Sequence, residues 1–121
     1  MKVLAIDDNK EITDMLSLYF ETQGIEFTAI NDGRQGLEVI RTDDSNLVLL
    51  DLAMPGFSGV DIVDYLKKEN QIESKNIVIF TASSVSNELF EDLKKTGVKG
   101  ILKKPVDMNA LEEMIARFRP V

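Results

Sequence analysis

Five short apolar runs alternate with stretches of helical spacing along this chain, and this alternation limits the fold more than any other feature. The runs are Val3–Ile6, Ile25–Ile30, Leu47–Leu50, Ile77–Phe80 and Gly100–Leu102. Short continuous runs of β-branched and aliphatic residues are typical of strands that are buried on both sides. Strands that alternate with helices predict a parallel sheet covered on both faces. The sequence therefore predicts an α/β fold with a parallel sheet built from these five runs.

The segments between the runs repeat apolar residues at three- and four-residue spacing, as one face of a helix requires. These stripes are Ile12/Leu16/Tyr19/Phe20, Leu37/Ile40, Val60/Val63/Leu66, Leu89/Phe90/Leu93 and Leu111/Ile115/Phe118. Gly24 and Gly97 follow the first and fourth predicted helices, where the left-handed conformation favours glycine. Asp107 is placed to cap the start of the last helix.

Composition excludes several classes of function. The 121 residues suit one domain, which we expect to span residues 1–121, and the net charge of −7 argues against direct nucleic-acid binding. No apolar run reaches the length of about 18 residues that would predict a membrane span. The chain has no cysteine, which excludes disulfides and fits a cytoplasmic location, and it has no histidine to carry a phosphoryl group.

Polar residues with useful chemistry stand where the apolar runs end. Asp7 and Asp8 directly follow the first run, and Asp51 directly follows the third. Thr81 follows the fourth run and Lys104 follows the fifth. The carboxyl ends of parallel strands share one edge of the sheet, which is where α/β proteins bind ligands. We therefore expect these residues, although distant in sequence, to converge on one site.

The charges at this expected site call for a cation. Three carboxylates contribute −3 and Lys104 contributes +1, so one divalent ion would balance the remaining −2. Oxygen ligands without nitrogen or sulfur suit Mg²⁺ or Mn²⁺. Without a metal, repulsion between the carboxylates is expected to raise the pKa of at least one of them. A metal, a lysine and a hydroxyl together suit the stabilisation of a phosphoryl group, with a carboxylate as the nucleophile.

Each of these residues also has a purely structural explanation when it is considered alone. Asp7 and Asp8 could start a helix capped by Asn9, and Asp51 could cap the turn at Met54-Pro55-Gly56. Thr81 could simply end a strand, and Lys104 could form a solvated pair with Lys103. Chance explains their joint placement at successive strand ends poorly, and this placement favours the site.

Four segments in a fixed order resemble the receiver domains of two-component response regulators, including the single-domain chemotaxis type. They are Val-Leu-Ala-Ile-Asp-Asp at 3–8, Asp-Leu-Ala-Met-Pro-Gly-Phe-Ser-Gly at 51–59, Thr-Ala at 81–82 and Lys-Lys-Pro at 103–105. Each segment is weak by itself, whereas the ordered set is specific and covers essentially the whole chain.

The resemblance implies a flavodoxin-like fold with strand order 2-1-3-4-5, and it implies a signalling role. Asp51 would be the phosphoacceptor, taking its phosphoryl group from the phosphohistidine of a sensor histidine kinase. The Thr81 hydroxyl would donate to a phosphoryl oxygen, and Lys104 would pair with the phosphoryl group. The domain would assist only its own phosphorylation and dephosphorylation, so it would not be an enzyme with a separate substrate.

The resemblance also implies the metal ligands and the partners. Asp8 would bind Mg²⁺ directly, Asp7 largely through water, and Asp51 and the backbone carbonyl of Ala53 would complete the protein's ligands; Mn²⁺ is the alternative ion. The output would be a downstream protein target or a fused output domain, reached through exposed parts of residues 87–96 and 107–119. We expect no direct contact with nucleic acid or membrane, and a monomer or weak dimer.

The chain departs from the common receiver pattern at Ile101, where many receivers have tyrosine or phenylalanine. An isoleucine has no ring to swing toward Thr81, so we expect the loop after Thr81 or the fourth helix to carry the switch. Ala53 and Ser83 occupy positions that tune phosphoryl lifetime in the family, and both are small. The Lys104-Pro105 bond is where receivers often have a cis peptide, which a following proline permits.

Three other functions fit the sequence less well. A flavin-binding protein of the same topology needs a loop that holds phosphate, and the acidic loop at 7–11 would repel it. A metal-dependent phosphatase for small molecules needs a cap or pocket around its substrate, and the chain has no insertion long enough to form one. A binding module that is never phosphorylated would not need the complete set of acids, threonine and lysine.

Overall fold

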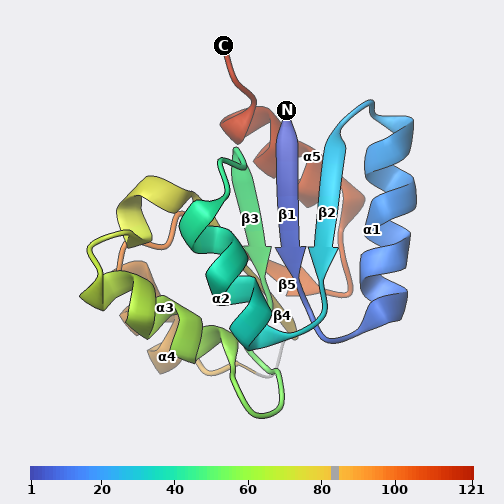
Figure 1. Cartoon of the computed structure of the whole chain (residues 1–121). Helices are drawn as coiled ribbons and strands as arrows, with labels where there is room; N and C mark the ends of the chain where they lie inside the picture. Colours follow the sequence, from blue (N-terminus) through green and yellow to red (C-terminus); the bar gives the residue numbers. More distant parts are fainter. Residues whose placement is uncertain (83–84) are drawn as a thin grey trace.

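The computed structural model describes residues 1–82 and 85–121, which form a parallel sheet with helices on both faces (Figure 1). The strands are β1 (Lys2–Ile6), β2 (Glu26–Ile30), β3 (Leu47–Leu50), β4 (Ile77–Ala82) and β5 (Gly100–Lys104). The helices are α1 (Lys10–Thr22), α2 (Gly33–Thr42), α3 (Gly59–Lys68), the 3₁₀ helix η1 (Ile72–Lys75), α4 (Asn87–Lys94) and α5 (Met108–Phe118). Every predicted strand and helix is confirmed, and η1 is an addition that the sequence pattern did not indicate.

The strand order is β2-β1-β3-β4-β5, and all neighbouring strands are parallel. This confirms the flavodoxin-like order that the family resemblance implied. The register pairs Ile6 of β1 with Ile30 of β2 and with Leu50 of β3. The residues that follow these three therefore emerge side by side at the carboxyl edge, which lies at the arrowheads in Figure 1.

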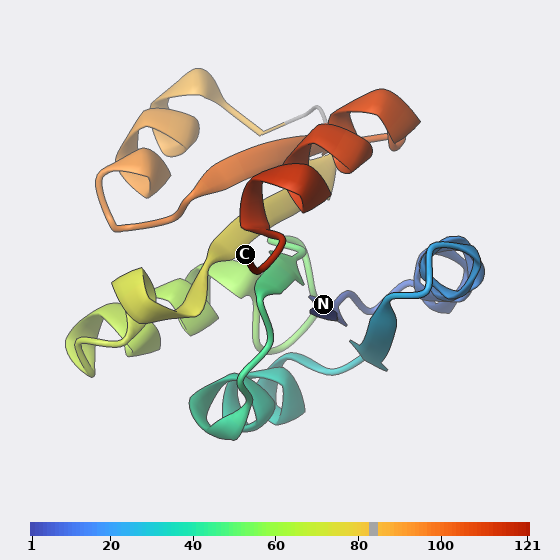
Figure 2. The ribbon, with the colours of Figure 1, turned by 90° about the horizontal axis from the view of Figure 1, so that it is seen from above.

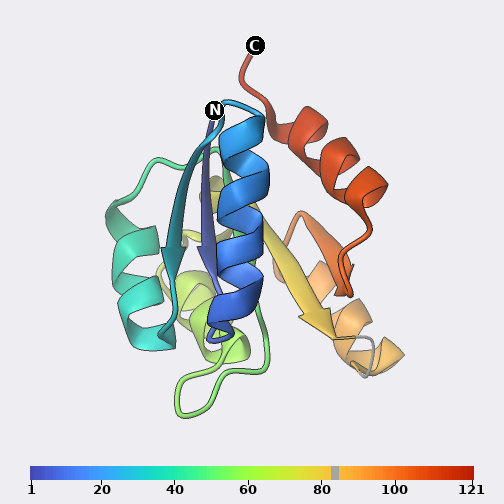
Figure 3. The same cartoon turned by 90° about the vertical axis from the view of Figure 1, so that its right-hand side faces the viewer.

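Helices α1 and α5 cover one face of the sheet, and α2, α3 and α4 cover the other (Figures 2 and 3). Strand side chains alternate between the faces. In β4, for example, Ile77 and Ile79 join the apolar cluster beneath α2, α3 and α4, whereas Val78 and Phe80 join the cluster beneath α1 and α5. Burial on both faces explains why the strands appear in the sequence as continuous apolar runs.

Side-chain caps fix where the helices begin. The Asn9 carboxamide oxygen accepts the backbone N–H groups of Glu11 and Ile12, and Asp107 caps α5 as predicted. Gly24 and Gly97 have φ angles of 67° and 114°, so the left-handed conformation expected after α1 and α4 is confirmed. Because Asn9 caps α1 itself, the helix start leaves the two preceding acids available for the site.

None of the helices in the described part of the chain combines the length and the apolar character that crossing a bilayer requires.

Candidate functional site

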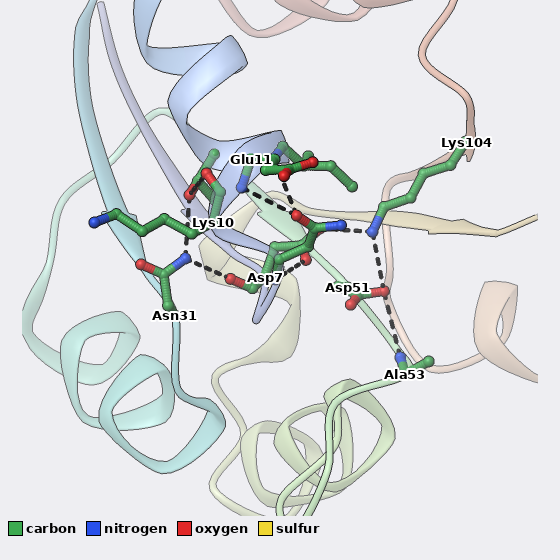
Figure 4. Close-up of polar contacts among 10 residues, drawn as sticks. Asp7, Lys10, Glu11, Asn31, Asp51, Ala53 and Lys104 are labelled. Atoms are coloured by element: carbon green, nitrogen blue, oxygen red, sulfur yellow. Dashed lines mark hydrogen bonds and ion pairs between the residues drawn. The ribbon is translucent and has the colours of Figure 1, made fainter.

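The three predicted acids meet at the carboxyl edge of the sheet. Asp7 and Asp8 follow β1, Asp51 follows the adjacent strand β3, and one carboxylate oxygen from each lies within 4.8 Å of the others. Asp7 and Asp51 are buried, with 1% and 4% of their surface exposed, whereas Asp8 is exposed. The predicted convergence is confirmed for these residues (Figure 4 labels Asp7 and Asp51).

Lys104, the last residue of β5, reaches the acids that follow β1 and β3. Its Nζ atom lies 2.6 Å from Asp7 Oδ2 and 3.6 Å from Asp51 Oδ1. The ammonium group also lies 5.2 Å from the centroid of the Phe80 ring. β4 lies between β3 and β5 in the sheet, so the long lysine side chain has to cross the end of β4 (Figure 4). The alternative explanation of Lys104 as one of a solvated pair with Lys103 is therefore wrong, and the Lys104–Pro105 peptide is cis as expected.

The environment of Asp51 disfavours its charge. Burial is the largest cause that raises the pKa of this carboxyl group, and the negative charge of Asp7 adds to it, while Lys104 and a hydrogen bond from the Ala53 N–H lower it. The Ala53 N–H donates to Asp51 Oδ1 at 3.3 Å, and no hydrogen bond from the described residues reaches Oδ2. The predicted rise in a carboxyl pKa is thus confirmed in direction, and the cause is burial first and repulsion second.

Thr81 lies inside β4 rather than after it, and the structure does not join it to the acids. It is fully buried, and its hydroxyl group has no hydrogen-bond partner among residues 1–82 and 85–121. By strand alternation Thr81 shares a face with Ile79, beneath α2 to α4, whereas Lys104 shares a face with Leu102, beneath α1 and α5. Thr81 therefore links the edge of the site to the helical layer that contains α4.

The loop after Asp51 is held by unusually close backbone contacts. A Cβ atom on Gly59, the first residue of α3, would lie 2.1 Å from the Asp51 carbonyl oxygen. A Cβ atom on Gly33, the first residue of α2, would lie 2.0 Å from the Phe57 carbonyl oxygen. The Gly59 N–H also donates to the Leu52 carbonyl at 3.1 Å. Glycine at these two positions lets α2 and α3 pack directly against the loop that begins at Asp51.

The sequence pattern did not indicate Asn31 as a site residue, but this residue contacts the site. Its Nδ2 atom donates to the backbone carbonyl of Asp7 at 2.7 Å and to Thr13 Oγ1 at 3.1 Å (Figure 4). The available signal was its position directly after β2, at the same edge as the acids. Ser83, expected to tune phosphoryl lifetime, lies outside the described residues.

The donor atoms fit a hard divalent cation. The cluster offers three carboxylate oxygens within 4.8 Å of one another and neither nitrogen nor sulfur ligands. A cation there would also offset the unfavourable charge of buried Asp51, whose pKa is raised chiefly by its burial. The residues therefore fit the Mg²⁺ site that the sequence predicted.

The family model of the response regulator receiver domain matches residues 3–116. The chain belongs to this family. Over 118 residues the receiver domain is 30% identical to the DNA-binding response regulator MtrA of Mycobacterium tuberculosis strain H37Rv, a match that covers 98% of the chain and 49% of MtrA. It is 26% identical over 120 residues to sporulation initiation phosphotransferase F of Bacillus subtilis, covering 99% of the chain and 94% of that relative.

Solved structures agree with this membership. The chemotaxis protein CheY4 of Vibrio cholerae superimposes with a TM-score of 0.83 at 27% identity, covering 97% of both chains. The receiver domain spans about half the length of MtrA and nearly all of CheY4. Receivers are signalling phosphoacceptors of two-component systems, and they bind Mg²⁺ at their acidic cluster.

Lys104→Met is expected to lower the free energy of unfolding by about 2 kcal/mol at neutral pH without Mg²⁺, because it leaves a buried Asp7 carboxylate without its cation. Loss of a buried partner often costs 3–5 kcal/mol, and the 18% exposure of the Lys104 side chain reduces that figure. Urea denaturation measures the difference. Mg²⁺ should stabilise this variant more than the wild type, since it supplies the missing positive charge.

Lys103→Met is the matched control, because Lys103 lies over the Phe90 ring and forms no ion pair with the acids in the described structure. It is expected to change the free energy of unfolding little. Equal losses in the two variants would show that Lys104 does not stabilise the buried acids.

Proposed function

We propose that this receiver domain, comprising residues 1–121, is a cytoplasmic phosphoacceptor that takes a phosphoryl group from the phosphohistidine of a sensor histidine kinase onto Asp51. One observation carries the proposal: the buried Asp51 carboxylate lies 3.6 Å from the Lys104 ammonium and beside the carboxylates of Asp7 and Asp8. A nucleophile, a fixed positive charge and oxygen ligands for a metal therefore share one sheet edge.

In the proposed transfer, Asp51 Oδ2 forms a bond to phosphorus as the bond between phosphorus and the histidine nitrogen breaks. This oxygen receives no hydrogen bond from the described residues, whereas Oδ1 is held by the Ala53 N–H. Lys104, which already lies near Asp51, would pair with the new phosphoryl oxygens. The buried Thr81 hydroxyl, which has no partner among the described residues, would donate to another of these oxygens.

Asp7, Asp8, Asp51 and the Ala53 carbonyl would hold Mg²⁺, or Mn²⁺, whose positive charge would stabilise the phosphoryl oxygens. The geometry supports different roles for the two adjacent acids. Asp7 already accepts the Asn9 N–H at 2.9 Å through Oδ1 and Lys104 at 2.6 Å through Oδ2, which suits contact with the metal through water. Asp8 is exposed and suits direct ligation.

Intact mass spectrometry after treatment with acetyl phosphate tests the proposal. With Mg²⁺ the chain is expected to gain one phosphoryl group, and with a chelator it should gain none. A chain that is yellow as purified would instead indicate a flavoprotein, and one that consumes many equivalents without becoming labelled would favour a phosphatase. No gain under any of these conditions would favour a binding module that is never phosphorylated.

The proposed output surface comprises exposed parts of α4, β5 and α5, and it would contact a downstream protein target or a fused output domain. A groove of about 540 Å³ lies between α4 and β5, with Phe90 and Ile101 in its apolar lining. Lys94, Lys99 and Lys103 also line this groove, although the chain as a whole carries a net charge of −7. This charge contrast suits a target segment with acidic and apolar side chains, while the net charge argues against nucleic acid. The domain itself is proposed to be a monomer or weak dimer that acts on no separate substrate.

Phosphorylation is expected to shift the amide resonances of residues 87–96 and 107–119 in ¹H–¹⁵N spectra. Thr81 and Ile101 lie on the sheet face toward α4, so movement of Thr81 toward the phosphoryl group would be transmitted to that layer without an aromatic ring at position 101. Residues 43–46, at the opposite edge of the sheet, provide the internal reference and should shift little. Unchanged resonances in 87–96 and 107–119 would contradict this choice of output surface.

A further inference from the structure

Asn31 holds the backbone of the acidic pair through both hydrogens of its side-chain amide group. Its two amide hydrogens go to the Asp7 carbonyl at 2.7 Å and to Thr13 Oγ1 at 3.1 Å. Thr13 is buried, with 2% of its surface exposed, and its hydroxyl donates to the Lys10 carbonyl at 3.1 Å. Since that hydroxyl hydrogen is committed to Lys10, Thr13 presents only a lone pair to Asn31. Both partners of the Asn31 amide are therefore acceptors, which orients the amide in one way.

This contact completes the fixation of Asp7. The Asp7 N–H donates to the Ile30 carbonyl at 3.1 Å, its carboxylate oxygens accept from Asn9 and Lys104, and its carbonyl accepts from Asn31. The carbonyl of Asp7 belongs to the peptide plane that joins Asp7 to Asp8. The orientation of that plane sets the direction from which the exposed Asp8 carboxylate approaches the cluster.

We propose that Asn31 is a positioning residue of the metal site, which fixes the Asp7–Asp8 peptide so that the Asp8 carboxylate points toward Asp51. The inference rests on the proposed Mg²⁺ site at these acids, and it assigns to Asn31 no contact with the metal or the phosphoryl group. Mg²⁺ affinity would then depend on the side-chain amide of Asn31, which follows β2 and contacts Thr13 of α1 but is not itself a metal ligand.

Asn31→Ala is expected to weaken Mg²⁺ binding by about tenfold, as loss of a group that orients metal ligands typically does. Asn31→Asp should weaken it at least as much, because a carboxylate of the same shape cannot donate to the Asp7 carbonyl. Isothermal titration calorimetry with Mg²⁺ alone measures both. In addition, the Asp8 amide resonance of each variant should differ from that of the wild type before any Mg²⁺ is added.

Asn46→Ala is the matched control. Asn46 also uses its side chain in a bond to backbone, accepting the Lys2 N–H at 2.8 Å, but it lies at the amino edge of the sheet. It should lose stability while keeping wild-type Mg²⁺ affinity. If Asn31→Ala does not fold, Thr13→Val serves in its place. It removes the acceptor that orients the Asn31 amide, together with the hydrogen bond to the Lys10 carbonyl, and it keeps the Asn31 bond to the Asp7 carbonyl, so a smaller but measurable loss of affinity is expected.

Wild-type Mg²⁺ affinity in every folded variant of Asn31 and Thr13 would overturn the inference while leaving the proposed function intact. Absence of Mg²⁺ binding by the wild-type chain would overturn the proposed metal site, and the role of Asn31 with it. Weaker binding in the Asn31 and Thr13 variants, with unchanged binding in Asn46→Ala, is the result that supports the inference.

Discussion

Asp51→Asn is expected to abolish the phosphoryl gain completely and, without Mg²⁺, to raise the free energy of unfolding by about 1 kcal/mol or more. The carboxamide keeps the shape of the side chain but cannot form an acyl phosphate. It also removes a buried negative charge that lies beside Asp7 and that the structure disfavours. Intact mass after acetyl phosphate treatment and urea denaturation measure the two effects.

The stabilisation should depend on pH in a defined direction. Burial and Asp7 raise the pKa of Asp51 in the folded state above its value in the unfolded chain. The folded wild type therefore binds a proton more tightly than the unfolded chain, and loses stability as pH rises from the ordinary aspartate range through the raised folded value. The advantage of Asp51→Asn should be small at acidic pH, grow through that window and stay constant above it.

Asp44→Asn provides the control, because the Asp44 side chain is 91% exposed and precedes β3, at the amino edge of the sheet. This variant should gain one phosphoryl group as the wild type does, and it should show no comparable stabilisation. A phosphoryl group retained by Asp51→Asn would remove Asp51 from its proposed role.

Gly59→Ala is expected to lower the free energy of unfolding by about 3 kcal/mol and to weaken both Mg²⁺ binding and phosphorylation. The added Cβ atom would lie 2.1 Å from the Asp51 carbonyl oxygen and 2.9 Å from the Leu52 Cα atom. These are backbone atoms that cannot rotate away, so the start of α3 and the loop at Asp51 must separate. Urea denaturation gives the stability change, and calorimetry with Mg²⁺ gives the change in affinity.

Gly100→Ala tests whether any glycine in this fold would give the same result. A Cβ atom there would lie 3.0 Å from Cε of Met114, the mobile end of a flexible side chain. The loss is expected to stay below about 1 kcal/mol, with Mg²⁺ affinity unchanged. Equal losses at the two positions would show that contact with the Asp51 backbone is not what requires glycine at 59.

The sequence predicted the layers of the fold well because the signals were local. The run Leu47–Leu50 is buried on both sides, and its neighbours in the sheet share that property, so continuous apolar strands alternating with helices indicated a covered parallel sheet. The caps at Asn9 and Asp107 and the positive-φ glycines were visible for the same reason. η1 was not predicted because its four residues contain one apolar side chain, Ile72, and so show no repeat of apolar positions at helical spacing.

The candidate site was predictable only as a set of strand ends. Placing Asp7, Asp8 and Asp51 after strands that share an edge needs no more than the parallel connection rule. By contrast, the orientation of Thr81 toward the helical layer containing α4 depends on where β4 ends, and the sequence pattern placed that end at Phe80 instead of Ala82. Because β4 is two residues longer than predicted, Thr81 lies inside the strand, and strand alternation assigns its side chain to one face of the sheet.

By itself the sequence determined the α/β class, the placement of acids at strand ends and the match to the receiver pattern, because these features follow from residue spacing along the chain. Only the tertiary structure decided that Lys104 bonds to Asp7 more closely than to Asp51, that Asn31 holds the Asp7 carbonyl, and that Gly59 must be glycine. Each of these contacts joins different elements, and their distances depend on sheet register and helix approach, which no local pattern encodes.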